Sequence, residues 1–118
     1  MTAKEIGDFG ESVAAEFLEK KNIKVLKRNY HCRAGEIDII AKDGDCTVFC
    51  EVKTRHSSDF GTPAEFVDFR KQEKIMKTAL YYTMRDDIEM RFDVVEVFYT
   101  KKGDVMVVTK VNHIENAF

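Results

Sequence analysis

Two apolar segments that carry acidic and basic side chains place the strongest constraint on how this chain folds. Residues 36–42 and 47–54 are rich in Ile, Val and Phe, a composition that favours β-strands. The link between them, Asp43-Gly44-Asp45, is a turn signal. The sequence therefore predicts a β-hairpin over these residues.

The charged residues of this hairpin lie at strand spacing. Glu51 and Lys53 are two residues apart, so both side chains leave the same face of a strand. A buried sheet face rarely carries Asp, Glu and Lys together unless they are paired or hold a metal. Asp38, Glu51 and Lys53 are therefore a candidate site. The alternative is a buried ion pair of Lys53 with Glu51 or Asp38 and no metal.

The register of the hairpin decides whether the two carboxylates meet. If Lys42 pairs with Thr47, Asp38 lies opposite Glu51. If Lys42 pairs with Asp45, Asp38 is displaced from Glu51 by one diagonal step. Both arrangements keep the acids on one face, whereas an odd-length loop without a bulge would separate them.

Hydrophobic periodicity and turn signals predict two helices and three further strands around the hairpin. The predicted segments are a helix from Thr2 to about Lys21, strands at 23–29, 91–99 and 105–111, and a helix from Thr62 to about Arg85 with a break near Asp68 left open. The order is αβββαββ in a single domain, residues 1–118. This order favours an α/β fold with a mixed sheet flanked by helices.

The predicted first helix carries an acid at the edge of its apolar stripe. Glu11 lies on a row with Gly7, Ala14 and Leu18, so it faces the border of the core. We expect Gly7 and Ala14 to let this helix approach the sheet closely.

The predicted second helix has an apolar side and a basic side. We expect the apolar side to consist of Phe69, Met76, Ala79, Leu80 and Thr83, with Gln72 on the same line. Arg70, Lys74 and Lys77 are expected to project from the other side.

Composition limits the class of protein without naming a partner. The formal net charge is −2, yet basic residues cluster at 20–33 and again at 70–77, a patchiness that permits phosphate binding. A solvated lysine-rich face is the alternative.

No apolar stretch predicts a membrane span or a signal peptide, and the three Cys lack a CxxC pair, so we expect a cytoplasmic protein with reduced thiols. Small apolar roles for Cys46 and Cys50 are favoured over a zinc site with His31 and Cys32.

Carboxylates that converge on one point are the ligands by which proteins hold Mg²⁺ or Mn²⁺. Asp38 and Glu51 supply two such groups, the backbone carbonyl of Val52 is a candidate third ligand, and Glu11 is the candidate from the helix. Lys53 could orient the attacking water or neutralise charge on a phosphate, and a metal that lowers the pKa of its water makes a nucleophile near neutral pH. The reaction that this pattern favours is phosphodiester hydrolysis.

Motifs along nearly the whole chain together resemble those of a known protein family. They are Gly7-x2-Gly10-Glu11-x2-Ala14, Arg28-Asn29, Gly35-Glu36-Ile37-Asp38-Ile39-Ile40, Val48-Phe49-Cys50-Glu51-Val52-Lys53-Thr54-Arg55, Gly61-x-Pro63, Lys71, Arg91-Phe92-Asp93 and His113-Ile114-x2-Ala117-Phe118. This ordered set resembles the bacterial YraN-like proteins. That family is similar to the archaeal Holliday-junction resolvases of the restriction-endonuclease-like PD-(D/E)xK superfamily.

The resemblance implies a three-layer restriction-endonuclease-like core, metal ligation by Glu11, Asp38 and Glu51, and Lys53 as the catalytic lysine. It also implies a Mg²⁺- or Mn²⁺-dependent endonuclease that acts on double-stranded or branched DNA. Homodimers are common among such enzymes, because two strands must be cut symmetrically. Alternatives are a non-catalytic nucleic-acid-binding or repair adaptor that retains the fold, and a ribonuclease or accessory protein that acts within a complex.

Further residues receive weaker assignments. Candidate nucleic-acid contacts are Arg55, Arg70, Lys71, Gln72 and Lys74, each against the alternative of an ordinary surface residue. We expect Asp93 to be structural, and His31, His56 and His113 to be non-catalytic.

Overall fold

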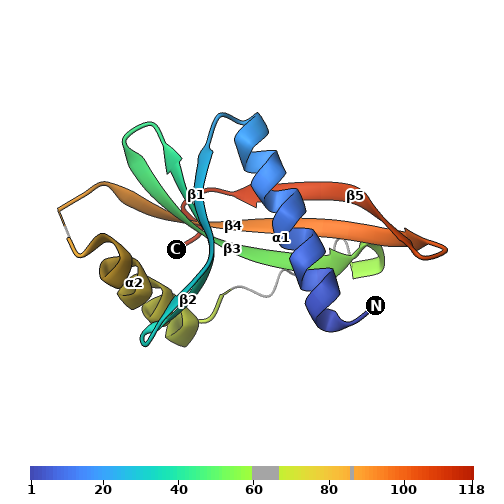
Figure 1. The fold of residues 1–118 in the computed structure, drawn as a ribbon, viewed down its shortest axis with the longest axis horizontal. Helices are drawn as coiled ribbons and strands as arrows, with labels where there is room; N and C mark the ends of the chain where they lie inside the picture. The colour runs from blue at the N-terminus through green and yellow to red at the C-terminus, as the bar shows by residue number, and fades with distance from the viewer. Residues whose placement is uncertain (60–66, 86) are drawn as a thin grey trace.

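The computed structural model describes residues 1–59, 67–85 and 87–118 and shows a mixed sheet with two long helices (Figure 1). The elements are α1 (Ala3–Lys20), β1 (Lys24–Cys32), β2 (Gly35–Asp43), β3 (Cys46–His56), the short 3-10 helix η1 (Ser57–Asp59), α2 (Phe69–Thr83), β4 (Met90–Lys102) and β5 (Val105–Ile114). The predicted order of helices and strands is confirmed. Neither long helix of the described residues is apolar enough to cross a membrane.

The five strands lie in the order β1-β2-β3-β4-β5, with β3 and β4 parallel and all other neighbours antiparallel. The parallel pairing requires a crossover, and the chain makes it through α2. In the β2–β3 hairpin Lys42 pairs with Thr47, so the first of the two registers considered is the observed one. The last paired residues are Ile39 and Cys50, so Asp38 and Glu51 lie just beyond the end of this ladder.

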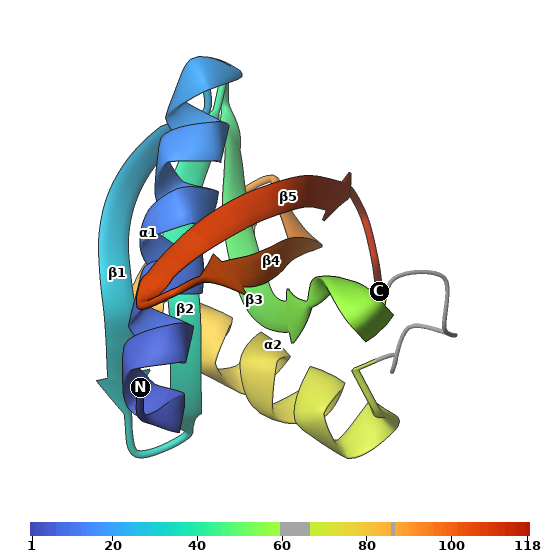
Figure 2. The same cartoon turned by 90° about the vertical axis from the view of Figure 1, so that its right-hand side faces the viewer.

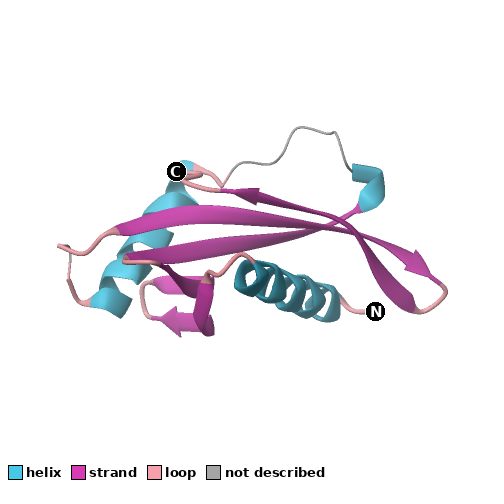
Figure 3. Cartoon of the chain, turned by 90° about the horizontal axis from the view of Figure 1, so that it is seen from above, coloured by secondary structure: helices cyan, strands magenta, loops and turns pink. Residues whose placement is uncertain are grey.

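The two faces of the sheet carry separate cores, each covered by one helix. Ala14 and Leu18 of α1 pack with residues such as Ile39 and Cys50 on one face. Ile75 and Ala79 of α2 pack with residues such as Phe49 on the other. The helices therefore form the outer layers, and Figures 2 and 3 show the strands between them. The mixed α/β architecture is confirmed.

Helix α1 begins at a capping box, in which the Thr2 hydroxyl accepts the Glu5 N–H and the Glu5 carboxylate accepts the Thr2 N–H, both at 3.1 Å. It lies close against the sheet at Gly10. A Cβ added there would lie 1.7 Å from Thr54 Oγ1, whereas a Cβ at Gly7 would meet nothing within 4 Å. The expectation that Gly7 allows the close approach is therefore wrong, because the helix crosses β3 one turn later. Gly10 brings the neighbouring Glu11 against the sheet.

Helix α2 begins at Phe69, with the Asp68 carboxylate accepting the Lys71 N–H at 2.8 Å as the N-cap. The predicted start at Thr62 lies outside the described residues. The helix ends at Thr83, two residues earlier than expected, because Met84 takes the left-handed conformation.

The predicted apolar side of α2 is confirmed at Ala79 but is wrong at Phe69, Met76 and Leu80. Ile75, Thr78 and Ala79 are buried, while the expected core residues Phe69 and Leu80 are exposed. The helix is rotated so that its compact Thr78 and Ala79 lie against the sheet. The Thr78 hydroxyl donates to the Lys74 carbonyl at 2.7 Å, so this polar group can be buried at little cost.

Substitution at the helix crossing gives a matched pair of variants. We predict that Gly10→Ala destabilises the fold by about 1–3 kcal/mol, because the new methyl group overlaps Thr54. Gly7→Ala is the control and should stabilise by about 0.5–1 kcal/mol, since only helix propensity changes. Urea unfolding measures both, and equal effects would refute the close contact.

Candidate functional site

The β2–β3 ladder stops short of the hairpin's open end. Backbone pairing ends at Ile39–Cys50; beyond it, β2 pairs only with β1, and β3 only with β4. At this point the Asp38 carboxylate accepts the Val52 backbone N–H at 2.8 Å. A side chain thus replaces the next rung of the ladder, and the strands separate around an acidic group.

The chain bends where the strands separate. Ile37 and Ile39 are two residues apart but belong to opposite cores, so the alternation of side chains is interrupted at Asp38. On the neighbouring strand, Asn29 has a positive φ of 52°, a left-handed conformation that a non-glycine residue seldom adopts. These two irregularities are adjacent in the β1–β2 pairing, because Tyr30 pairs with Ile37.

A hollow of about 490 Å³ opens between α1 and the separated strands. Glu11 of α1 and Asp38 both line it, as predicted for two ligands of one site. Its other lining residues include Asn29, Glu36, Val52 and Thr54. Because Val52 lies on this wall, its backbone is placed beside Asp38.

The surroundings of Asp38 disfavour its negative charge. Burial, followed by the charges of Glu51 and Glu11, raises the pKa of Asp38 to about 7. The Val52 N–H and the Lys71 ammonium act in the opposite direction, but only in part. The result is an acidic region in which Asp38 retains its proton up to a higher pH than an exposed Asp does.

The other two predicted acids are each paired with a basic side chain. Glu11 is buried and accepts from Arg28 Nε at 3.0 Å. Glu51 Oε1 accepts from Lys71 Nζ at 2.5 Å, and the Glu51 side chain is only 10% exposed. Glu51 thus faces α2, while Glu11 approaches from α1. By strand alternation, Lys53 shares the face of Glu51 and is half-buried.

The acids gather around one gap but do not form a ready-made metal cage. In the part of the chain that the structure describes, no group of three or more His, Cys, Asp or Glu side chains is arranged to hold a metal ion. Ligation by Glu51 requires it to exchange its contact with Lys71.

The predicted nucleic-acid contacts divide into three groups. Arg70, Lys71 and Lys74 line a second hollow, of about 520 Å³, between α2 and the β1–β2 turn. Arg55 is largely buried, and its Nε lies 3.2 Å from Glu96 Oε2. Gln72 donates from its side chain to the Val67 carbonyl at 2.8 Å. The side chains of Arg55 and Gln72 therefore already have contacts within the protein.

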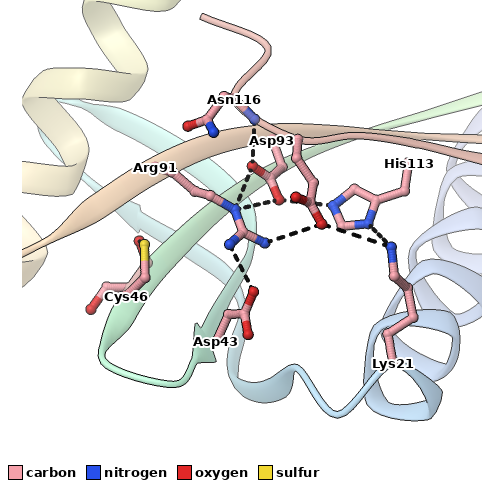
Figure 4. A network of polar contacts seen from close by, with 9 residues as sticks. Lys21, Asp43, Cys46, Arg91, Asp93, His113 and Asn116 are labelled. Carbon is pink, nitrogen blue, oxygen red and sulfur yellow. Dashed lines mark hydrogen bonds and ion pairs between the residues drawn. The ribbon is translucent and has the colours of Figure 1, made fainter.

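Asp93 and His113 belong to a second buried polar cluster (Figure 4). The Asp93 carboxylate accepts from Arg91 Nε, from His113 Nε2 at 2.8 Å and from the Asn116 backbone N–H. Lys21 Nζ lies 2.8 Å from His113 Nδ1; since an ammonium only donates, the ring proton is on Nε2. Burial alone would raise the pKa of Asp93, but the His113, Asn116 and Arg91 contacts hold it below its ordinary value.

This second cluster joins β4, β5, the C-terminal residues and the end of α1. Arg91 also reaches Asp43 at the end of β2, with 2.7 Å between Nη1 and Oδ2. The structural role expected for Asp93 fits these contacts. The Arg91-Phe92-Asp93 and C-terminal motifs are thus one contact network in space.

Sequence reasoning missed the ion pairs that Arg28 and Lys71 form with Glu11 and Glu51. Arg28 belongs to the Arg28-Asn29 motif, but only the placement of β1 beside α1 shows that its side chain contacts Glu11. Lys71 was predicted to contact nucleic acid, and its bond to Glu51 depends on how α2 is rotated.

Fold and site together define a small α/β protein with an acid-lined gap in a mixed sheet. Comparison with known proteins identifies its family: residues 10–97 match the model of the uncharacterised protein family UPF0102, and the chain belongs to this family. A UPF0102 protein of Caldicellulosiruptor bescii is 48% identical over 122 residues, covering 100% of both chains. One of Clostridioides difficile is 46% identical over 121 residues, again covering both completely. The resemblance to the YraN-like family is thereby confirmed.

The raised pKa of Asp38 implies that the free energy of unfolding depends on pH. The unfolded chain releases this proton near pH 3.8 and the folded chain near pH 7, so the folded state binds more protons in between. The free energy of unfolding should therefore fall as pH rises across this window. Asp38→Asn keeps an acceptor for Val52 N–H without the charge.

We predict that Asp38→Asn has near-parental stability at about pH 4 and exceeds the parent by about 2–4 kcal/mol at about pH 8, without divalent cations. Urea unfolding across this range is the measurement. Asp104→Asn, at an exposed position in the β4–β5 turn, is the control and should show no such trend. A constant difference between Asp38→Asn and parent at every pH would contradict the assignment.

Proposed function

We propose that this protein is a Mg²⁺- or Mn²⁺-dependent endonuclease that hydrolyses phosphodiester bonds of DNA. The observation that carries the proposal is the site at which the β2–β3 ladder stops. There Asp38 bonds to Val52 N–H and lines one hollow with Glu11, while Glu51 and Lys53 follow on the adjoining strand.

The residues present fit a hard divalent cation. Asp38 is a buried carboxylate whose charge is opposed by Glu51 and Glu11, and a cation would relieve that repulsion. All the candidate donors are oxygen atoms, which Mg²⁺ and Mn²⁺ prefer. Asp38, Glu51 and the Val52 carbonyl would hold the ion, and Glu11 would border it. The ion supplies a lowered pKa for water and neutralises charge on the phosphate.

The chain's own groups have separate tasks in this scheme. The Val52 N–H fixes the orientation of the Asp38 carboxylate. Lys53 neutralises charge on the reacting phosphate or orients the attacking water. Lys71 now contacts Glu51. If Glu51 held the ion, the Lys71 ammonium would be free to contact a phosphate beside the site. Arg28 holds the Glu11 carboxylate at the rim through the contact of its Nε with Glu11 Oε1 at 3.0 Å.

The basic groups next to the gap support a nucleic-acid substrate. Arg70, Lys71 and Lys74 line the hollow that borders Glu36, and Glu36 also lines the hollow of Asp38 and Glu11. A chain of phosphates can therefore continue from the site onto α2. The resemblance to Holliday-junction resolvases points to DNA, including branched DNA, and to a possible homodimer.

The test is cleavage of a panel of branched, linear and single-stranded DNAs, with RNA for comparison, in Mg²⁺ and in Mn²⁺. We predict metal-dependent cleavage by the parent and a loss of at least about 100-fold in Asp38→Asn and Lys53→Met. Lys101→Met, at an exposed position at the far end of β4, is the matched control and should cleave as the parent does.

Two results would contradict the proposal. Equal cleavage by the parent and Asp38→Asn would identify a contaminating nuclease. Tight DNA binding by the parent with no cleavage of any substrate would favour the non-catalytic nucleic-acid-binding protein instead.

A further inference from the structure

Two hollows lie along α2, the first of them beside the candidate site, and together they are called the α2 groove here. Its first part is the hollow of about 520 Å³ that Arg70, Lys71 and Lys74 line on the helix side. Its second part, of about 680 Å³, is lined by Ala34, Lys77, Leu80, Tyr81, Met84 and Arg85. The β1–β2 turn contributes to both parts, with Gly35 in the first and Ala34 in the second.

The residues that α2 presents along this groove form one row. Arg70, Lys74, Lys77 and Tyr81 are spaced by four, three and four residues, which places them on a single face of the helix. All four are exposed. The row is cationic near the candidate site and aromatic at the far end, where Leu80 and Met84 are also exposed.

The acids of the groove leave this positive character intact. Asp68 lines the first part, but its carboxylate caps the helix through the Lys71 N–H. Glu36 is the other lining acid, and it lies at the end that meets the candidate site. Glu73, on the same helix, lines neither part.

This combination fits a nucleic-acid strand whose bases are unpaired. Cations spaced along a groove complement successive phosphates, whereas apolar and aromatic side chains bind the faces of bases. In a duplex these faces are covered by stacking, so Tyr81, Leu80 and Met84 can reach them only in a single strand. We propose that the α2 groove binds a single-stranded nucleic-acid segment, with its phosphates on Arg70, Lys74 and Lys77 and a base on Tyr81.

The inference refines the proposed function and rests on it for the position of cleavage. The groove begins at Glu36 and Lys71, beside the candidate site. The bond to be cut then lies next to a single-stranded segment, as in a flap or splayed arm. A fully paired junction would leave the aromatic end of the groove without a ligand.

Binding without metal tests the groove independently of catalysis. The chain contains no Trp, so Tyr81→Trp introduces its only indole fluorophore. Titration with a short oligothymidylate in EDTA should quench this indole by base stacking. Val105→Trp, at the exposed first residue of β5, is the matched control and should not respond. The turn between β4 and β5 lies at the opposite end of the molecule from α2 (Figure 1).

Anisotropy with labelled DNA gives the second readout. Tyr81→Ala should weaken oligothymidylate binding about tenfold and leave duplex binding unchanged, while Tyr81→Phe should retain parental affinity. Lys74→Ala and Lys77→Ala should each lower the salt dependence of single-strand binding by about 0.7 in logarithmic slope, and Lys101→Ala should not.

Equal losses for single strands and duplex in Tyr81→Ala, or quenching of the Val105→Trp indole to the same degree, would overturn the groove assignment. The two proposals fail separately. If cleavage depends on Asp38 but Tyr81→Ala binds oligothymidylate as the parent does, the groove is wrong and the nuclease stands. If Tyr81 is required but nothing is cleaved, the groove stands as a binding surface without the proposed reaction.

Discussion

The candidate site depends on one contact, the hydrogen bond from the Val52 backbone to the Asp38 carboxylate. It satisfies an N–H that β2 no longer pairs, and it fixes an acid where the two strands separate. Without it, a buried backbone donor would lack a partner at the mouth of the hollow. The same contact places Asp38 between Glu11 on the α1 side and Glu51 on the α2 side.

Such an arrangement is costly for a protein that only has to fold. Burial and two neighbouring acids disfavour the charge of Asp38, while Arg28 and Lys71 compensate the other two carboxylates. The second polar cluster shows the contrast: Asp93 is fully buried, yet its hydrogen bonds and Arg91 hold its pKa low.

Sequence patterns predicted the elements and the hairpin register well, because both follow from local rules. Strand composition and the Asp-Gly-Asp turn restricted the pairing to two registers, of which one is observed. The expectation that Asp38 and Glu51 share one face is wrong, because the alternation of side chains is interrupted at Asp38, which lines the hollow beside α1 while Glu51 contacts Lys71 of α2. Long-range packing was harder to predict from the sequence. The close approach at Gly10 rather than Gly7 depends on where α1 crosses β3, and the rotation of α2 depends on which of its faces fits the sheet.

The candidate site was predictable in its acids but not in their partners. Glu11, Asp38 and Glu51 stand out because acids in apolar segments are costly. Their bonds to Arg28, Val52 and Lys71 join residues that are 17, 14 and 20 positions apart, and no local pattern encodes them. The sequence did not predict the exposed end of the α2 groove either, because the rotation of α2 depends on long-range packing. Leu80, which we expected in the core, is exposed there beside Tyr81.

The most direct test of the central claim is a crystal structure of the protein soaked in Mn²⁺, with anomalous diffraction to locate the ion. The account predicts a single strong peak in the β2–β3 gap within about 2.0–2.6 Å of carboxylate oxygens from Asp38 and Glu51. Lys71 should have moved away from Glu51. An empty gap at saturating Mn²⁺, with the Glu51–Lys71 pair intact, would contradict it.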